Sequence, residues 1–414
     1  MTDRLYYREP YRRSFDATVR AVYQRPGRVA VVLDRTAFYP TSGGQPFDTG
    51  VLGGCPVVEV VEVEEGVEVA EGVERLQDAA HDTAVIHVLA PDAGAPSVGD
   101  EVHGEIDWPR RFDHMQQHTG QHVLSAAFDR LFGARTVSFH LGSEAATIDL
   151  AREMTDVEIA SAESEANRIV WEDRPVAVRF ASKEEAARMP LRKEPVRQGT
   201  LRLIDIEGWD LSACGGTHVA TTGGIGLIAV ASRERFKGGQ RLEFLCGGRV
   251  LTRFRSNRDS LAASVRLLSV LPNELPASIE RLQADAKEQK RLSVSLQADL
   301  ARYRAAELSA EAENTAVGKL VLRSLDLDAG SLKALAVAIA RAPGFFIVLV
   351  SSSTPALAVV ARSADGHRSA QEVVSSLVAR FGGRGGGKPE LAQGGGLSAQ
   401  PATILEFTRA LLVS

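Results

Sequence analysis

Cysteine is scarce in this sequence, which contains only Cys55, Cys214 and Cys246 among its 414 residues. So sparse and odd a set excludes a disulfide framework and favours a reducing compartment. Long apolar runs are missing as well, and without a stretch of about 18 apolar residues we expect no membrane-spanning helix. The first residues are charged and lack the apolar core of a secretory signal. These absences predict a cytoplasmic protein.

An excess of positive charge is also absent. The net charge of −5 argues against a protein that coats nucleic acid without specificity. Local basic patches are still allowed, because phosphates respond to charges within about 8–10 Å. Hydrophobic residues make up 44% and charged residues 24% of the chain, as in an ordinary globular protein, and 414 residues predict two or three domains.

The pattern along the chain predicts a multi-domain α+β protein. Residues 1–107 contain runs rich in β-branched residues, such as 57–69, separated by Gly, Asp and Pro, which favours a β-barrel-like domain. Residues 108–250 begin with apolar residues at helical spacing over 112–132, which end at Gly133. Short strands and a second helix follow, so we expect an α+β domain there.

Residues 251–314 are predicted to form a helical linker. Between Ile279 and Tyr303, apolar residues recur in steps of three and four, as in a helical hairpin or a dimerising coiled coil. A spacer helix that packs on its own domain is the alternative. Pro272 and Pro276 break the linker into two helices, because proline does not fit a helix interior.

Residues 315–414 are predicted to form a separate α/β domain, because strand and helix patterns alternate there. The expected strands cover residues 345–352 and 356–363, and the expected helices cover 332–341, 370–380 and 402–412. A glycine-rich loop, residues 382–396, is expected between the last two helices.

Two short motifs predict a metal site. His118-Thr-Gly-Gln-His122 places two imidazoles at i and i+4 of the expected helix, on one face. Cys214-Gly-Gly-Thr-His218 presents a thiolate and an imidazole from a loop that its glycines allow to turn tightly. Three histidines and one cysteine suit tetrahedral Zn²⁺. We interpret His114 as a neighbour of the site or a solvent-facing residue, and Cys246 as a small buried hydrophobe.

Four motifs in order carry a resemblance to a known family. They are the glycine-rich segment of residues 36–50, HTGQH with the following VLSAAF, CGGTHV with the following TGGIG, and GGRGGGKPELAQGGG. With these motifs the chain resembles the alanyl-tRNA editing proteins, in the long form whose C-terminal domain is shared with alanyl-tRNA synthetases. The resemblance covers nearly the whole chain.

The resemblance implies hydrolysis of serine, and as a second target glycine, from mischarged alanine tRNA. It implies one Zn²⁺ per chain, held by His118, His122, Cys214 and His218. No aminoacylation domain is recognised, so we expect editing of released tRNA without ATP. Four protein ligands are typical of a structural zinc, whereas a catalytic zinc keeps one position open. The sequence therefore leaves open whether zinc activates the attacking water or only positions the site, and it assigns no general base.

The resemblance also assigns contacts to substrate. The residues expected to bind the amino acid are Thr41, Ser42, Gly43, Gly44, Gln45, Gln121 and His140. Gln121 and His140 depart from the residues usual in synthetase editing domains. Cations expected to contact phosphates of the acceptor end are Arg110, Arg111, Arg235, Lys237 and Arg241. Arg384, Gly386 and Lys388 of the terminal domain are expected at the outer corner of the tRNA, and the linker or terminal domain would form any homodimer.

Three other interpretations have to be weighed. Threonyl-tRNA synthetase has a related histidine–cysteine editing fold, so the edited tRNA could differ, although the glycine-rich motifs favour the alanine branch. A zinc-containing tRNA-binding module without turnover is a second alternative. Phosphoesterase activity, suggested by the terminal domain, is disfavoured because no cluster of aspartates suits two metals.

Overall fold

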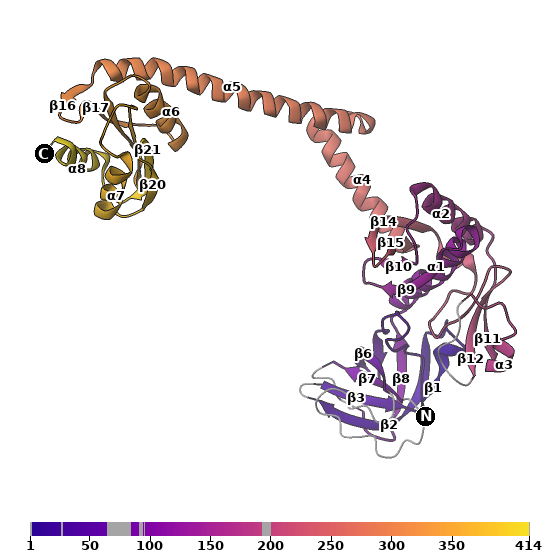
Figure 1. Ribbon diagram of the computed structural model, residues 1–414. Coiled ribbons are helices and arrows are strands. Elements are labelled where there is room, and N and C mark those ends of the chain that lie inside the picture. Colours follow the sequence, from indigo (N-terminus) through magenta and orange to yellow (C-terminus); the bar gives the residue numbers. More distant parts are fainter. Residues whose placement is uncertain are drawn as a thin grey trace. The chain divides into compact units, whose positions relative to one another are not determined.

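The computed structural model describes residues 2–25, 28–63, 84–90, 94, 96–192 and 200–413. The chain divides into two compact units, Met1–Ala262 and Ala263–Ser414, which are considered one at a time. Figure 1 labels their helices and strands. Several sheets and packed helices confirm the predicted multi-domain α+β class. Within the described residues, no helix is long and apolar enough to cross a membrane.

Six strands of the first unit close into a barrel in the order β2-β3-β7-β6-β5-β8. They are β2 Ser14–Arg25, β3 Arg28–Leu33, β5 Gly50–Leu52, β6 Cys55–Val63, β7 Ala84–Leu89 and β8 Glu101–Ile106. Val102 and Ile106 of β8 are buried and Glu105 is exposed, which is the alternation that the pleat of a strand imposes. Gly104 completes the inward face, because a Cβ there would lie 2.5 Å from the Phe15 ring. The end of the expected strand 57–69 lies outside the described residues.

Helix α1, Trp108–Phe132, follows the barrel and carries two of the predicted ligands. It begins earlier than predicted, because the Asp107 side chain accepts a hydrogen bond from the Arg110 N–H and Pro109 occupies the first turn. Gly133 ends the helix with a φ of 61°, as the sequence predicts.

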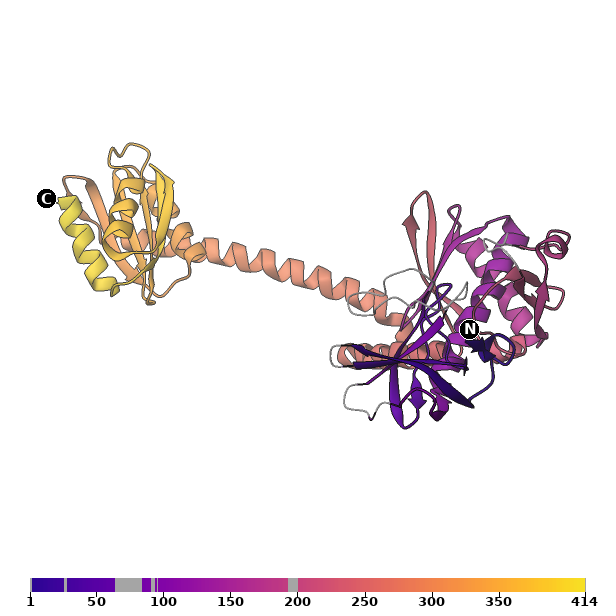
Figure 2. The same ribbon diagram turned by 90° about the horizontal axis from the view of Figure 1, so that it is seen from below.

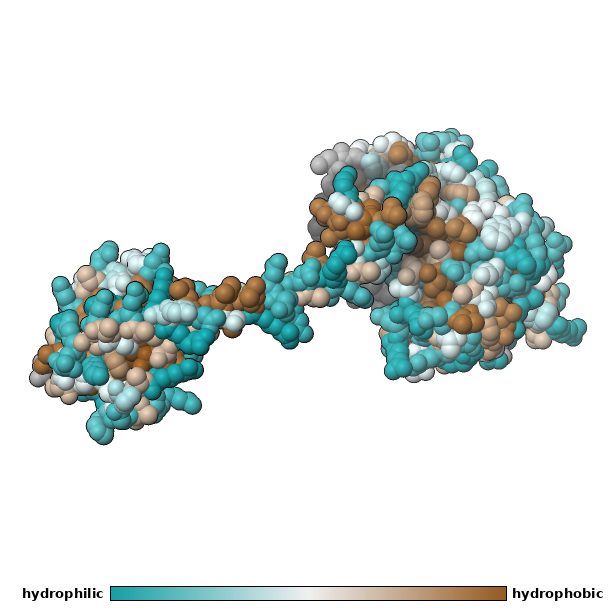
Figure 3. All heavy atoms as spheres, turned by 90° about the horizontal axis from the view of Figure 1, so that it is seen from above, coloured by the Kyte–Doolittle hydropathy of each residue, from teal (hydrophilic) through white to brown (hydrophobic). Residues whose placement is uncertain are grey.

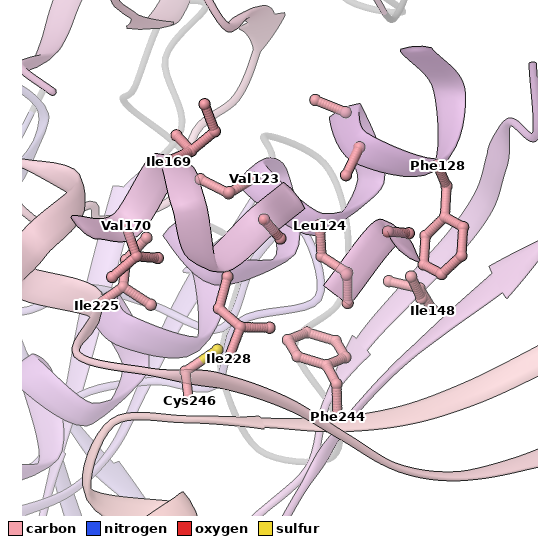
Figure 4. Packing of buried hydrophobic residues seen from close by; sticks show 14 of the residues in the cluster. Val123, Leu124, Phe128, Ile148, Ile169, Val170, Ile225, Ile228, Phe244 and Cys246 are labelled. Carbon is pink, nitrogen blue, oxygen red and sulfur yellow. The ribbon is translucent and has the colours of Figure 1, made fainter. Parts of the chain in front are cut away.

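The α1 helix packs on a four-stranded antiparallel sheet in the order β14-β15-β10-β9. These strands are β9 Thr136–Leu141, β10 Ala146–Leu150, β14 Ile228–Phe236 and β15 Gly239–Cys246. Figure 4 shows Leu124 and Phe128 of α1 in one hydrophobic cluster with Ile148 and Phe244 of the sheet. Cys246 is fully buried in the same cluster, which confirms its predicted packing role.

The remaining elements of the first unit complete the surroundings of the site. Helix α2 packs against α1, and a small antiparallel sheet, β11-β12-β13, leads into the Cys214 turn. The bounds are α2 Asp156–Trp171, β11 Val176–Ala181, α3 Lys183–Ala186, β12 Leu201–Ile206 and β13 Asp210–Ala213. Short β1, Asp3–Arg4, pairs in parallel with β4, Arg35–Thr36. Helix α4, Gly248–Leu268, starts after β15.

The second unit contains a six-stranded sheet in the order β16-β17-β18-β19-β21-β20. Its strands are β16 Glu313–Thr315, β17 Gly318–Leu325, β18 Phe345–Ser351, β19 Ala356–Arg362, β20 Arg384–Lys388 and β21 Leu391–Leu397. Its helices are α5 Leu275–Ala310, α6 Ala329–Ala340, α7 Ala370–Phe381 and α8 Pro401–Val413. Alternate residues of β18 enter one hydrophobic core with α7 and α8 and another with α5 and α6, so helices cover both faces (Figure 2).

Two features of this unit correct or refine the prediction. Residues 382–396 were expected to form a loop, but they include the paired strands β20 and β21. Glycine disfavours strands in general, and here the missing side chains let the hairpin lie directly on α7. Pro276 lies in the first turn of α5, where its missing N–H is tolerated. Figure 3 shows hydrophobic residues exposed along α5, and coiled-coil pairing of this helix stays a prediction.

Candidate metal centre

The four residues predicted as ligands lie together. One ligand atom from each of His118, His122, Cys214 and His218 lies within 4.8 Å of every other one. Cys214 Sγ is 3.3 Å from His118 Nε2 and 3.4 Å from His218 Nε2. Helix α1 brings the first two residues one turn apart, and the turn after β13 brings the other two. The arrangement fits the donor set of a Zn²⁺ site.

Each histidine of the cluster has a partner for its second ring nitrogen. His118 Nδ1 lies 2.8 Å from Gln45 Oε1, and His122 Nδ1 lies 2.9 Å from Asp210 Oδ2. His218 Nδ1 lies 3.2 Å from Thr119 Oγ1. Carboxylate and amide oxygens only accept hydrogen bonds, so Gln45 and Asp210 hold the Nδ1 proton and direct Nε2 toward the cluster. Such partners orient metal ligands.

Gln45 and Thr119 are themselves fixed by the Cys214–His218 turn. The Gln45 Oε1 also accepts from the Thr217 N–H at 3.1 Å, and its Nε2 donates to Thr217 Oγ1 at 2.9 Å. The Val219 N–H donates to Thr119 Oγ1 at 3.1 Å. The glycine-rich motif and the α1 helix are therefore joined to the ligand turn by hydrogen bonds that are buried from water.

Charge within the cluster favours a thiolate. Burial raises the pKa of the Cys214 thiol, but the neighbouring His118 and His218 outweigh it and bring the pKa well below its usual range. Burial lowers the pKa of His122, yet hydrogen bonds to Asp210 and Cys214 raise it to about 9. Burial lowers the pKa of His218 to about 3. A deprotonated sulfur beside a neutral imidazole is the form that binds metal.

Two glycines of the motifs are needed for space. A Cβ at Gly216 would lie 2.1 Å from His118 Cε1, and a Cβ at Gly120 would lie 2.2 Å from Cys246 Sγ. Gly215 differs, since the nearest atom to a Cβ there is the Tyr7 hydroxyl at 3.7 Å. The second glycine of CGGTH therefore makes room for a ligand, whereas the first does not.

Asp210, Arg192 and Ser212 form a network that the sequence did not reveal. Arg192 donates from Nε to Asp210 Oδ1 at 2.6 Å and from Nη2 to Oδ2 at 3.1 Å. The Ser212 hydroxyl donates to the same carboxylate. Although burial raises the pKa of Asp210, hydrogen bonds from His122 and Arg192 hold it below its usual range. Asp210 lies four positions before Cys214, and only that proximity could have suggested it.

A cavity of about 160 Å³ opens beside the cluster and is lined in part by His118, His122 and Cys214. Other described residues of its lining include Gly43, Gln121, Thr136, Ser138, Phe139, Arg192 and Ser212. The predicted substrate residues Gly43 and Gln121 thus reach the cavity. Gln121 donates to Ser125 Oγ at 2.8 Å.

The other predicted substrate residues lie elsewhere. Gln45 contacts the ring of His118 and not the cavity. Thr41, Ser42 and Gly44 form the turn beside Gly43 and are outside the described lining. His140 is exposed on β9, opposite Thr147 of β10, and also lies outside that lining. These positions follow from the strand register, which the sequence alone does not fix.

The predicted tRNA-binding cations of the first unit differ in how far their side chains are exposed to solvent. Arg111 is a correction: its side chain is fully buried and pairs with buried Asp48, so it is not available to a phosphate. Arg110 is partly buried and donates to the Phe47 carbonyl at 3.0 Å. The sequence does not predict the burial of Arg111, because its partner Asp48 lies 63 residues away.

The hairpin of β14 and β15 carries three of these cations. Arg235 is exposed and lies 3.2 Å from Glu153. Lys237 is exposed at the turn, and Arg241 pairs with Asp149 at 2.7 Å while its guanidinium lies over the Phe236 ring. Arg384, Gly386 and Lys388 are exposed on β20 of the second unit. Arg235, Lys237 and the three β20 residues are therefore accessible to a partner, whereas Arg241 is partly buried.

His114 is buried near the start of α1, and its Nδ1 has no hydrogen-bond partner among the described residues. Burial lowers its pKa to about 4, so the ring is neutral. The solvent-facing alternative for His114 is therefore wrong. It is also outside the metal cluster.

Family models match three parts of the chain. The tRNA synthetases class II (A) model matches residues 13–110. The threonyl and alanyl tRNA synthetase second additional domain matches residues 201–243, and the DHHA1 domain matches residues 314–413. The second of these matches contains Asp210, Cys214 and His218.

Curated relatives match nearly the whole chain. The alanyl-tRNA editing protein AlaX-L of Pyrococcus horikoshii is 29% identical over 98% of this chain and 97% of its own length. The alanine–tRNA ligases of Pyrococcus abyssi and Natronomonas pharaonis are 33% and 35% identical over 95% of this chain. The chain spans 42% of the length of these ligases. The resemblance carried by the four motifs is thereby confirmed.

Proposed function

Because the chain resembles the long form of the alanyl-tRNA editing proteins along nearly its whole length, we propose that it hydrolyses the ester of mischarged alanine tRNA. The amino acid removed is serine, with glycine as a second substrate. The observation that carries this proposal is the cluster of three buried histidines and half-buried Cys214 at the wall of a cavity lined with hydroxyl groups.

The residues that would hold zinc are His118, His122, Cys214 and His218. Bound zinc would supply positive charge beside the ester, either to activate water or to anchor the site. The chain fixes the imidazoles beforehand, because Gln45, Asp210 and Thr119 contact the nitrogens that face away from the cluster. This preorganisation lowers the cost of orienting groups during hydrolysis.

Hydroxyl groups of the cavity suit recognition of serine. Ser138 donates its proton to Asp149, Ser212 donates to Asp210, and Thr136 donates to Ser125 Oγ at 2.7 Å. Since these protons already have acceptors, the hydroxyl oxygens present lone pairs to the cavity and accept hydrogen bonds from a seryl hydroxyl or an α-amino group. Alanine and glycine both lack the hydroxyl and would forfeit about 1–3 kcal/mol at such a site, so serine is the preferred substrate.

The tRNA itself would be held by cations outside the cavity. Arg235 and Lys237 of the β14–β15 hairpin would contact phosphates of the acceptor end, which fix position without reading sequence. The β20 strand of the second unit, with Arg384, Gly386 and Lys388, would contact the outer corner.

The deciding experiment measures release of amino acid from alanine tRNA charged with serine, glycine or alanine. Serine-charged threonine tRNA is included to test the alternative substrate. We expect rapid release of serine from alanine tRNA, slower release of glycine and retention of alanine. Cys214→Ala should abolish release, and Cys55→Ala, which changes a buried cysteine of the barrel, should retain it.

Two results would contradict the proposal. Preferred release from threonine tRNA would reassign the substrate. Binding of tRNA and zinc without hydrolysis of any ester would support the binding module without turnover. Adding alanine and ATP to uncharged tRNA in the same assay tests the expectation that the chain does not aminoacylate.

A further inference from the structure

Arg192 brings a positive charge to the cavity. It is the one lysine or arginine in that part of the cavity lining that the structure describes. Its side chain is 15% exposed, so the guanidinium is largely enclosed yet accessible. Neither composition nor motif pointed to this residue, because it lies outside the four family motifs.

The guanidinium is held from behind. Two of its five N–H groups donate to Asp210, whose carboxylate is fully buried and also contacts His122 Nδ1. For the other three N–H groups, the described residues offer no acceptor within hydrogen-bond distance. The Arg192 guanidinium is thus held by Asp210 on one side, and its remaining N–H groups point away from that carboxylate. This arrangement is preorganised to bind a second anion, such as a carboxylate or a phosphate.

The substrate of the proposed function carries such an anion near the scissile ester. The ester joins the amino acid to the ribose of the terminal nucleotide, and the phosphodiester of that nucleotide is the nearest negative charge on the RNA. The cavity lining described contains no aspartate or glutamate that would repel it. Asp210 lies behind Arg192, where its charge is already paired.

We propose that Arg192 binds a phosphate of the 3′-terminal nucleotides and so places the ester beside His118, His122 and Cys214. This inference rests on the proposed function for the identity of the RNA. Arg192 is a substrate-binding residue in this scheme, and Asp210 is a positioning residue that connects it to His122. A purely structural Arg192 would support Asp210 and His122 without touching RNA.

The test measures binding of a fluorescent, uncharged RNA minihelix that ends in CCA, as a function of salt. Arg192→Met should weaken binding about tenfold at low salt and reduce the slope of log K against log salt by about one, because one phosphate contact is lost. Arg192→Lys should keep the salt slope and lose RNA affinity a few fold, since lysine retains the charge but lacks the paired donors of the guanidinium. Arg179→Met is the matched control, because Arg179 also pairs with an aspartate, Asp205, but lies outside the described cavity lining.

Zinc affinity, measured by competition with a chelator, separates the two roles. The proposal expects Arg192→Met to keep its zinc and lose RNA affinity. An unchanged salt slope in Arg192→Met would overturn the proposal. A loss of zinc in the same variant would then assign Arg192 a structural role through Asp210 and His122. If the unaltered protein binds the minihelix but releases no serine, the proposed function fails. The role of Arg192 in binding phosphate is then still decided by the salt slope.

Discussion

Glycine serves opposite purposes in the Cys214–His218 turn and in the β20 strand. Gly216 is buried, and its missing side chain makes room for the His118 ring. Gly386 of β20 is exposed, and a Cβ there would meet no atom within 4 Å. In the first region the freed space is used by the protein itself, and in the second it leaves the backbone open to a partner. Similar glycine runs therefore do not predict similar functions.

Loss of the metal from the Cys214–His218 turn should have the largest effect on activity. If it had no effect, the contrast between this turn and β20 would lose its basis, because the space at Gly216 would serve no active centre. We expect Cys214→Ala to lose stable zinc binding and to slow serine release by at least about 1,000-fold, since the thiolate and its three histidines are one unit. Metal content and single-turnover release are the measurements. Retained activity in a zinc-free Cys214→Ala protein would show that the buried cluster is not the active centre.

The second prediction compares two adjacent glycines of the turn. Gly216→Ala should displace His118 and weaken zinc binding about 10–100-fold, because the new Cβ would overlap the ring. Gly215→Ala should change it little, as its Cβ would have only ordinary contact with Tyr7. Chelator competition measures both. Equal behaviour of the two variants would contradict the view that the space at Gly216 is used by a ligand.

The third prediction concerns the pH dependence of zinc binding, because zinc competes with a proton for His122. In the metal-free protein the pKa of His122 is raised to about 9, so below that pH a metal has to displace its proton. Zinc affinity should therefore rise about tenfold per pH unit from pH 6.5 toward 9 and then level off. Asp210→Asn removes a partner that favours the charged ring, and it should move the levelling to lower pH. A flat profile for the unaltered protein would show that His122 is neutral before zinc binds.

The sequence was sufficient for the parts of the site that depend on local geometry. The positions His118 and His122 share a helix face in any α-helix, and Gly133 marks where that helix ends. The predicted start at residue 112 is wrong, because Asp107 caps the helix and Pro109 occupies its first turn. The pairing of the histidines with Cys214 was predicted from the ligand chemistry of the two motifs and from the family resemblance, because no local rule connects distant segments.

Tertiary contacts account for what the sequence did not predict. Arg111 was predicted to contact a phosphate, but it is fully buried and paired with Asp48. Arg192 has no role assigned from the sequence, and only the fold places it against Asp210. The glycines of residues 382–396 disfavour a strand locally, but packing on α7 and pairing of β21 with β19 account for β20 and β21. In each case the deciding partner lies far away in sequence or in another element.

The smallest expected effect concerns β20 and compares Gly385 with Gly386. Gly385→Ala places a Cβ 2.7 Å from Gly394 Cα and 2.8 Å from Val374 Cγ1, so it should destabilise the second unit by about 1–3 kcal/mol. Gly386→Ala meets no atom and should leave the thermal midpoint unchanged.

If the open backbone at Gly386 contacts tRNA, the added methyl group should weaken binding of full-length tRNA a few fold without changing stability. Binding of the minihelix, which lacks the outer corner, should stay the same in Gly386→Ala. Unchanged affinity for both RNAs would mean that β20 is exposed without being used at that position. The contrast with Gly216 would then be between a glycine that makes room for a ligand and one whose missing side chain is used neither by the hairpin nor by the RNA.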